Sequence, residues 1–281
     1  MCLFHCFPTC AGVNVIDDTG ETVTLAAPAR RIVSLAPHAT ELLFAAGAGD
    51  RIIGVMSDSD FPPAAARIPI VGNVNALDLE QILSLRPDLI VTWPYTTPAQ
   101  VGVLRAQGIA VFTTDPRTID GIAADLERIG SLVGRSEVAN ETARRLRARV
   151  ATLAQRAAGK RVVRVFYQVS AVPLYTVGGE HLISQALTLC GAHNVFGTLA
   201  LPAPEVALEA VLAARPEAIV AGTAGAIAPR WLDEWRRWHD LPAVRANKLF
   251  VVDANLLHRS GPRFVDGVEQ LCDVIERARA P

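Results

Sequence analysis

A fifteen-residue segment occurs twice in this chain. The sequence LDLEQILSLRPDLIV at residues 77–91 returns 129 positions later as VALEAVLAARPEAIV at 206–220, with seven positions identical. Solenoid repeats have periods of about 20 to 50 residues. A spacing of 129 residues is too long for a solenoid, so each copy belongs to its own domain-sized lobe. The repeat therefore predicts two related lobes with a ligand cleft between them.

Each copy of the repeat is predicted to be a helix followed by a buried strand. Leu79, Ile82 and Leu83 follow helical spacing. Pro87 cannot continue the helix, and Leu89–Val91 is a short apolar run without polar alternation. Such a strand is covered on both faces, as in the parallel sheets of α/β lobes.

Glu80 and Glu209 occupy the same register in the two copies. Packing does not require a carboxylate at this position, so the pairing favours a shared functional use. The alternative is a solvated helix start, where the helix dipole favours acidic residues. The repeat by itself leaves both interpretations open.

Length and composition agree with a soluble protein of two lobes. The 281 residues exceed the usual size of one domain, and 51% of them are hydrophobic, which is ample for two cores. No apolar run reaches the roughly 18 residues of a membrane span, and a net charge of −1 with scattered basic residues argues against nucleic-acid binding. We predict a leader and N-terminal extension at 1–30, an N-terminal lobe at 31–135, a connecting helix at 136–159 and a C-terminal lobe at 160–281.

The order of the predicted elements indicates an α/β fold. Strand-like runs such as Arg31–Leu35, Arg51–Val55 and Ile109–Thr113 alternate with helical segments, which predicts two Rossmann-like lobes with mainly parallel sheets. The segment 136–159 is rich in helix formers, lacks proline and ends at Gly159. One rigid helix between the lobes would permit only limited closure.

The amino terminus, MCLFHCFPTCAGVNV, contains three of the five cysteines. It is apolar, but it lacks the basic region of a secretory signal and has no lipobox before Cys10. We interpret it as the remnant of a signal that starts further upstream. Cys2, Cys6 and Cys10 have a regular spacing, but only His5 lies near them, so no metal site is predicted.

The other two cysteines, Cys190 and Cys272, lie in the second half of the chain. They can pair in an oxidising compartment, where closing so long a loop would stabilise the fold by roughly 4 to 5 kcal/mol. The alternative is two buried free thiols. The sequence pattern leaves both possibilities open.

Candidate ligand-binding positions follow from the predicted strands. In parallel α/β lobes, ligands contact the loops that come after the carboxyl ends of the strands. Polar and aromatic side chains on those loops are therefore the first candidates. They are His38, Asp58, Trp93, Tyr95, Tyr175, Asn255, His258 and Arg259.

Five separated motifs resemble one family. They are RIVSLAPHATELLFAAG, SDSDFPP, DLEQILSLRPDLIVTW, LTLCGAHNVFG and SGPRFVDGVEQLC, and the similarity extends over nearly everything from Arg31 to Ala278. The chain resembles the periplasmic cobalamin-binding family of bacterial ABC importers, within the helical-backbone (class III) substrate-binding proteins. The resemblance implies two Rossmann-like lobes joined by one long helix. It also implies capture of a bulky metal chelate in the cleft, without a cofactor of the protein's own.

The resemblance assigns roles to the paired residues. Glu80 and Glu209 match the family's two docking glutamates, one per lobe, which meet arginines on the dimeric ABC permease. Such charges mainly set the docking register and the association rate. Cys190 and Cys272 match the family's disulfide, which implies export to the periplasm. The protein is expected to act as a monomer.

The resemblance also implies a ligand-binding set. Trp93 and Tyr175 match aromatic positions that pack against the corrin ring, and aromatic faces suit a flat, apolar macrocycle. Asp58, Val74 and Ala203 stand where the cobalamin binder places aromatic residues. The predicted ligand-binding residues are His38, Asp58, Val74, Trp93, Tyr175, Ala203, Asn255 and Arg259.

Haem and ferric siderophores are the alternative ligands within the same family. Related haem binders hold iron through a tyrosine soon after the Pro-Pro loop, but this chain has Asn73 there, and asparagine is a poor iron ligand. A siderophore site would require several arginines around an anionic chelate, and only Arg259 and Arg263 are candidates. A corrinoid is therefore the preferred ligand.

An enzyme on the same scaffold is the competing class of function. The chain contains no G-x-G-x-x-G, P-loop or G-x-S-x-G motif. Ser170, His193 and Asp253 lack the surroundings of a nucleophile and its partners. The sequence therefore predicts a binding protein that breaks no bond.

Overall fold

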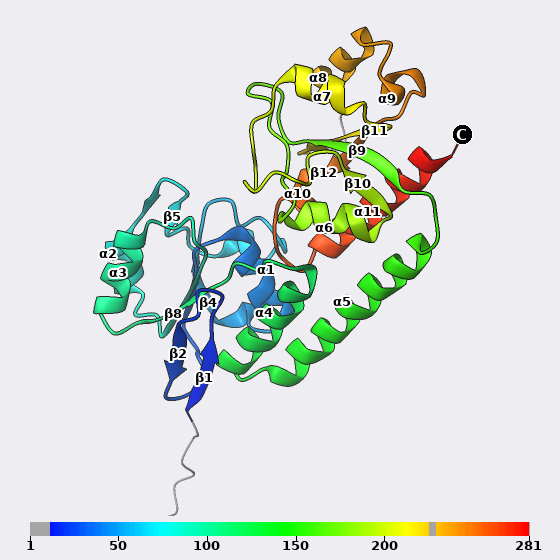
Figure 1. The fold of residues 1–281 in the computed structure, drawn as a ribbon. Helices are drawn as coiled ribbons and strands as arrows, with labels where there is room; N and C mark the ends of the chain where they lie inside the picture. The colour runs from blue at the N-terminus through cyan, green and yellow to red at the C-terminus, as the bar shows by residue number, and fades with distance from the viewer. Residues whose placement is uncertain (1–11, 225–228, 281) are drawn as a thin grey trace, which may run out of the picture. The chain divides into compact units, whose positions relative to one another are not determined.

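The structure is a computed structural model (Figure 1), which describes residues 12–224 and 229–280. Cys2, Cys6 and Cys10 lie outside the described residues. The chain divides into two compact units. Unit 1 contains the described residues up to 115 together with 124–143, and unit 2 contains 116–123 together with the described residues from 144 onward. Among the described residues, no helix is both long enough and apolar enough to cross a membrane.

Unit 1 is built on a four-stranded parallel sheet with the order β4-β3-β7-β8. Its helices α2 and α3 pack on one face of the sheet, where Ile82 and Leu104 join Ile90 in the core. Helices α1 and α4 lie on the opposite side (Figure 1). The elements are β3 (Ile32–Ser34), β4 (Ile52–Val55), β7 (Leu89–Thr92), β8 (Ala110–Thr113), α1 (Pro37–Ala45), α2 (Leu79–Ser84), α3 (Pro98–Ala106) and α4 (Ile119–Leu132).

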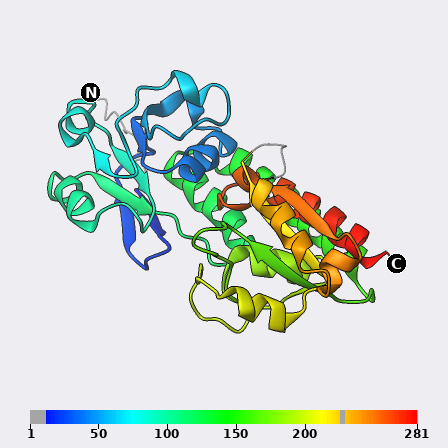
Figure 2. The same cartoon turned by 90° about the horizontal axis from the view of Figure 1, so that it is seen from above.

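An antiparallel hairpin of β1 (Val13–Ile16) and β2 (Thr22–Leu25) precedes this sheet. The hairpin packs beside β8 (Figure 2). The Asp17 carboxylate accepts a hydrogen bond of 3.0 Å from the backbone N–H of Thr113, at the end of β8. The hairpin is thus part of unit 1, and it lies within the segment 1–30 that is predicted to be leader and N-terminal extension.

Unit 2 is built on a second parallel sheet, with the order β10-β9-β11-β12. Helices α6 and α11 lie on one side of this sheet, and α7, α8 and α9 lie on the other (Figure 1). The core on the second side contains Phe166, Val211, Ile219 and Trp235. The elements are β9 (Val163–Gln168), β10 (Ala192–Asn194), β11 (Ala218–Thr223), β12 (Leu249–Asp253), α6 (Leu182–Leu189), α7 (Leu208–Ala214), α8 (Arg230–Asp233), α9 (Pro242–Arg245), α10 (Ala254–Leu257) and α11 (Phe264–Arg279).

The two sheets have the same topology. If the strands of each sheet are numbered in chain order, both sheets read 2-1-3-4. The repeated segment forms α2 and β7 in unit 1 and α7 and β11 in unit 2, so it supplies the third strand each time. The predicted α/β fold with two related lobes and parallel sheets is confirmed.

The helix-to-strand turn of the repeat has the same backbone in both copies. Arg86 and Arg215 adopt left-handed conformations, with φ of 48° and 45°. Each precedes a buried proline, Pro87 or Pro216. A residue before proline avoids the right-handed helical region, so the left-handed arginine ends the helix and turns the chain toward the strand.

A second arginine in each unit holds this turn. The Arg31 guanidinium donates to the carbonyl of Leu85 at 2.5 Å, and the Arg164 guanidinium donates to the carbonyl of Ala214 at 2.7 Å. Leu85 and Ala214 are equivalent positions of the repeat, 129 residues apart. The guanidinium groups thus satisfy carbonyl groups that the helix end leaves without an intrahelical partner.

Helix α5 (Ser136–Ala157) is the predicted connecting segment. It ends two residues before Gly159, which adopts a left-handed φ of 73°. Its second half is tied to α11 by a row of ion pairs, which places this half of the helix firmly in unit 2. The pairs are Arg149 with Asp266 and Glu269, Arg156 with Asp273, and, just after the helix, Lys160 with Glu276.

Candidate functional site

In unit 1, three aromatic rings line up after the strand ends. His38 lies in the first turn of α1, and its ring centroid is 5.4 Å from that of Trp93, in an edge-to-face arrangement. Trp93 follows β7 and lies 4.8 Å from Tyr95. His38 is buried, Trp93 is half-buried and Tyr95 is 70% exposed. The row therefore extends from the core to an apolar surface that a flat ligand can cover.

The other predicted positions of unit 1 lie on neighbouring loops. Val74 is 64% exposed and lines a small hollow together with Trp93 and Tyr95. Asp58 is exposed on the loop that follows β4. The structure thus brings Val74 to the aromatic row and leaves Asp58 as a surface carboxylate on an adjacent strand end.

In unit 2, the predicted positions lie on loops at the same edge of the sheet. Tyr175 is half-buried and forms isolated β-bridges with Ser170 and Glu205. Ala203 is exposed on the loop that leads to Glu205. This loop and the one after β9 are therefore held together through Tyr175.

The remaining two positions of unit 2 follow β12. The backbone N–H of Asn255 donates to the Asp253 carboxylate at 2.8 Å, which caps α10. The Asn255 and Arg259 side chains are both half-buried. The carboxyl end of β12 thus presents an amide and a guanidinium, which are groups suited to polar substituents of a ligand.

A hydrogen-bonded pair lies at the same strand ends. The Tyr167 hydroxyl is 3.1 Å from Nε2 of His258. Sequence reasoning nominated His258 but missed Tyr167, which lies in the middle of an apolar strand.

Burial and the nearby His258 lower the pKa of His181 to about 4. His181 Nδ1 accepts the backbone N–H of Ile183 at 3.1 Å, so the neutral ring caps α6.

Gly222 makes room for this pair. A Cβ atom at Gly222 would lie 2.5 Å from the Tyr167 hydroxyl and 2.7 Å from His258 Nε2. Gly222→Ala is therefore expected to destabilise the protein by about 1 to 3 kcal/mol through overpacking, measured by urea unfolding. Gly102→Ala is the matched control, because no atom lies within 4 Å of the added methyl group. Since Gly102 lies within α3, this control is expected to stabilise by up to about 1 kcal/mol. Equal midpoints for the two variants would contradict the prediction.

Glu80 and Glu209 take equivalent places in the two units. Each lies in the first turn of its helix, α2 or α7, and each is exposed. Within residues 12–224 and 229–280, neither carboxylate takes part in an ion pair. Two unpaired surface carboxylates at the same position of two helices are available to a partner protein.

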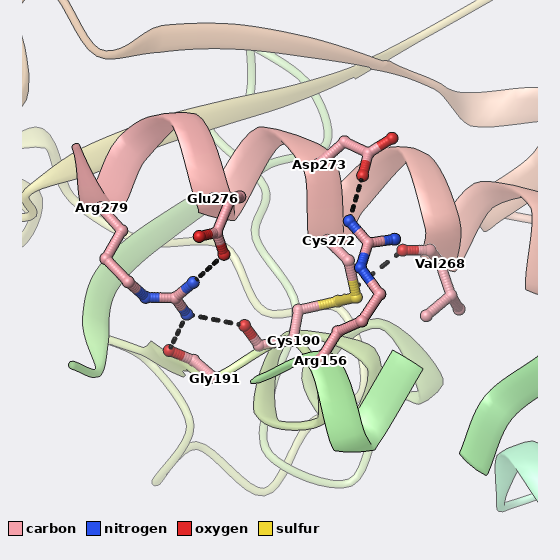
Figure 3. The surroundings of a disulfide bond; sticks show 8 residues. All are labelled: Arg156, Cys190, Gly191, Val268, Cys272, Asp273, Glu276 and Arg279. Atoms are coloured by element: carbon pink, nitrogen blue, oxygen red, sulfur yellow. Dashed lines mark hydrogen bonds and ion pairs between the residues drawn. A yellow bond between two sulfur atoms is a disulfide. The ribbon is translucent and has the colours of Figure 1, made fainter. Parts of the chain in front are cut away.

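Cys190 and Cys272 form a disulfide, as the family resemblance implies. The bond links the C-terminal end of α6 to α11, with a Cα–Cα distance of 4.8 Å, and both residues are buried (Figure 3). The Arg279 guanidinium donates to the carbonyl of Cys190 at 3.0 Å. The loops that hold the predicted positions Tyr175, Asn255 and Arg259 precede these two helices in the chain, so the bond links the helices that follow them.

A hollow of about 640 Å³ in unit 2 lies apart from the predicted positions. It is lined by the first turn of α4, by α6, and by β10 with the turn that follows it. None of the predicted ligand-binding residues lines it.

Among the described residues, no group of three His, Cys, Asp or Glu side chains is placed to hold a metal ion.

Comparison with known proteins gives consistent matches. A family model described as periplasmic binding protein matches residues 32–256. A vitamin B12-binding protein of Vibrio cholerae serotype O1 is 37% identical, over 90% of this chain and 91% of that protein. The crystal structure of the periplasmic vitamin B12 binding protein BtuF of Vibrio cholerae superposes with a TM-score of 0.81 at 35% identity, covering 90% of this chain and 99% of that one.

A more distant structure shows the fold alone. The periplasmic heme-binding protein BhuT, solved with two hemes, has a TM-score of 0.78 at 22% identity, over 89% of this chain and 99% of that one. The shared scaffold therefore does not by itself distinguish one chelate from another.

Proposed function

Because this chain belongs to the periplasmic binding protein family, we propose that it binds a corrinoid such as cobalamin and delivers it to an ABC importer. The observation that carries the proposal is the 37% identity, over nine-tenths of both chains, to a vitamin B12-binding protein. The aromatic row of His38, Trp93 and Tyr95 supports it, because a corrin ring is a flat macrocycle with apolar faces. Haem or a ferric siderophore remains the second candidate.

The ligand-binding residues belong to the proposal. The aromatic row supplies the apolar contact, with Val74 beside it. Polar groups of the ligand would meet the strand ends of unit 2 and the exposed Asp58, because amide substituents of a corrinoid both donate and accept hydrogen bonds. The full proposed set is His38, Asp58, Val74, Trp93, Tyr175, Ala203, Asn255 and Arg259.

Calorimetric titration tests the ligand directly. The protein is titrated with cyanocobalamin, with hemin and with a ferric hydroxamate siderophore. Binding of cyanocobalamin with a Kd below about 1 μM, corresponding to roughly −8 kcal/mol, is expected, and the other two should bind far more weakly. Tight binding of hemin or the siderophore without cyanocobalamin would overturn the corrinoid assignment and leave the family membership untouched.

We also propose that Glu80 and Glu209 dock the protein onto the permease. Replacing both by Ala is expected to lower importer-coupled uptake at least tenfold, while the Kd for cyanocobalamin changes by less than about twofold, because rim charges act on association with the partner. Glu137→Ala/Glu180→Ala removes one other exposed glutamate from each unit and serves as a charge-matched control. A loss of ligand affinity in the Glu80/Glu209 variant would rule out a pure docking role.

The remaining predictions are part of the same proposal. The protein acts as a monomer in the periplasm and catalyses no reaction. Its lobes extend over 31–135 and 160–281, with the connecting helix at 136–159 between them. The family itself consists of periplasmic binding proteins, which supports the compartment and the passive role.

A further inference from the structure

A hollow lined by tryptophan lies beside the helix that carries Glu209. It has a volume of about 200 Å³ and is formed entirely by unit 2. Leu208, the neighbour of Glu209 and the first residue of α7, lines it. The other lining residues are Gln168, Ala171, Leu174, Trp231, Glu234, Trp235, Arg237 and Trp238.

The hollow is built on a rigid base. Trp235 is 5% exposed, and its ring packs edge-to-face on Phe166 at 5.7 Å. Its indole N–H donates to the Gln168 side chain at 2.8 Å. Trp231 and Trp238, on either side of it in sequence, are half-buried. One tryptophan is thus anchored in the core and holds two others with part of their surface in solvent.

Two exposed carboxylates lie close in sequence to the lining residue Leu208. Val206 donates its backbone N–H to the carbonyl of Leu174 at 3.0 Å, so the segment 205–208 runs along the wall. Glu205 begins this segment and Glu209 follows it. Both are exposed, and neither forms an ion pair with any residue of the described part of the chain. The one arginine in the lining, Arg237, is already engaged by the Glu234 carboxylate at 2.8 Å.

The size and chemistry of the hollow suit a cationic side chain. Pockets for small-molecule ligands usually measure about 300 to 1,000 Å³, so 200 Å³ fits a side chain better than a metabolite. Tryptophan faces attract cations, and the planar guanidinium of arginine both stacks on them and pairs with carboxylates. Tryptophan and arginine are also enriched among the residues that dominate protein interfaces.

We propose that the hollow of Trp231 and Trp238 receives an arginine side chain of the permease, next to the one that pairs with Glu209. This inference rests on the proposed docking role of Glu209 and extends it from a single charge to a two-part contact. The carboxylates attract the basic partner, and the tryptophan faces hold one guanidinium by stacking.

A titration with small model compounds tests the seat without any permease. N-acetyl-arginine-N-methylamide is added to the protein labelled with ¹⁵N, and the four indole N–H signals are followed. The citrulline analogue, which has the same shape without the charge, is the control ligand. The signals of Trp231 and Trp238 should shift with the arginine compound and about fivefold less strongly with citrulline, while Trp93 stays unchanged. Equal shifts with both compounds, or none with arginine, would overturn the proposal.

Docking provides the second measurement. The importer is held in nanodiscs, and its association with the Trp231→Ala/Trp238→Ala variant should weaken by about tenfold. His239→Ala, an exposed neighbour, should associate like the unchanged protein. Cyanocobalamin affinity is measured on the same variants. If the tryptophan variant loses cyanocobalamin binding, the hollow belongs to the ligand site and the docking proposal fails, whereas failure of the unchanged protein to bind cyanocobalamin would count against the proposed function.

Discussion

Trp93→Ala is expected to weaken cyanocobalamin binding by about 100-fold, or roughly 2.7 kcal/mol. Trp93 is the central ring of the row that begins at His38 and ends at Tyr95. Its removal would take away the apolar surface offered to the ligand and the ring on which both neighbours pack. Calorimetric titration with cyanocobalamin measures the effect.

Two control variants isolate the ring contact. Trp93→Phe keeps an aromatic face and should lose less than about tenfold in affinity. Trp231→Ala removes another half-buried tryptophan, far along the chain in unit 2, and should bind cyanocobalamin normally. If Trp93→Ala binds as tightly as the unchanged protein, the aromatic row is not the ligand surface.

Loss of the Cys190–Cys272 disulfide is expected to lower the free energy of unfolding by about 4 to 5 kcal/mol. The two cysteines are 82 positions apart, and opening a loop of that length restores a large conformational entropy to the unfolded chain in the chain-entropy model. Both residues are buried between α6 and α11 (Figure 3), so alanine at both positions removes the link without exposing a charged group.

Urea unfolding of Cys190→Ala/Cys272→Ala, followed by tryptophan fluorescence, measures the loss. Three of the four tryptophans, Trp231, Trp235 and Trp238, belong to unit 2, so the signal reports mainly on the unit that contains the bond. The unchanged protein unfolded in excess reductant should show a similar loss. Midpoints that stay the same in both experiments would show that the loop closure contributes little stability.

The architecture could be predicted from the sequence because the two copies of the repeat, 77–91 and 206–220, share nearly the same pattern of buried and exposed residues. Ile82 and Val211 are buried, Glu80 and Glu209 are exposed, and the prolines that follow the helices, Pro87 and Pro216, are both buried. Helical spacing, a terminating proline and an apolar strand are local signals, and each copy folds as they indicate. Neither glutamate forms an ion pair with a described residue, which agrees with the surface position that either interpretation of the repeat requires.

Other features depended on contacts between distant parts of the chain. The sequence pattern left both a disulfide and two free thiols open for Cys190 and Cys272, and the structure joins them by a disulfide with their Cα atoms 4.8 Å apart. From the sequence, Tyr167 is indistinguishable from the apolar residues of its strand. In the structure, its hydroxyl lies within hydrogen-bond distance of His258, which is 91 positions away in the chain. A local pattern reports which face of an element is buried, but not which side chain it meets there.

The tryptophan hollow shows the same limit most clearly. The sequence shows three tryptophans between 231 and 238 and, separately, Glu209 in the repeat. Only the packing of Trp235 on Phe166 and the pairing of β9 with β11 bring α7 and these rings to one place. The sequence determined the two lobes, their parallel sheets and the matched glutamates, because those follow from periodicity along the chain. The tertiary structure decided which side chains meet, because such contacts join residues that no local spacing relates.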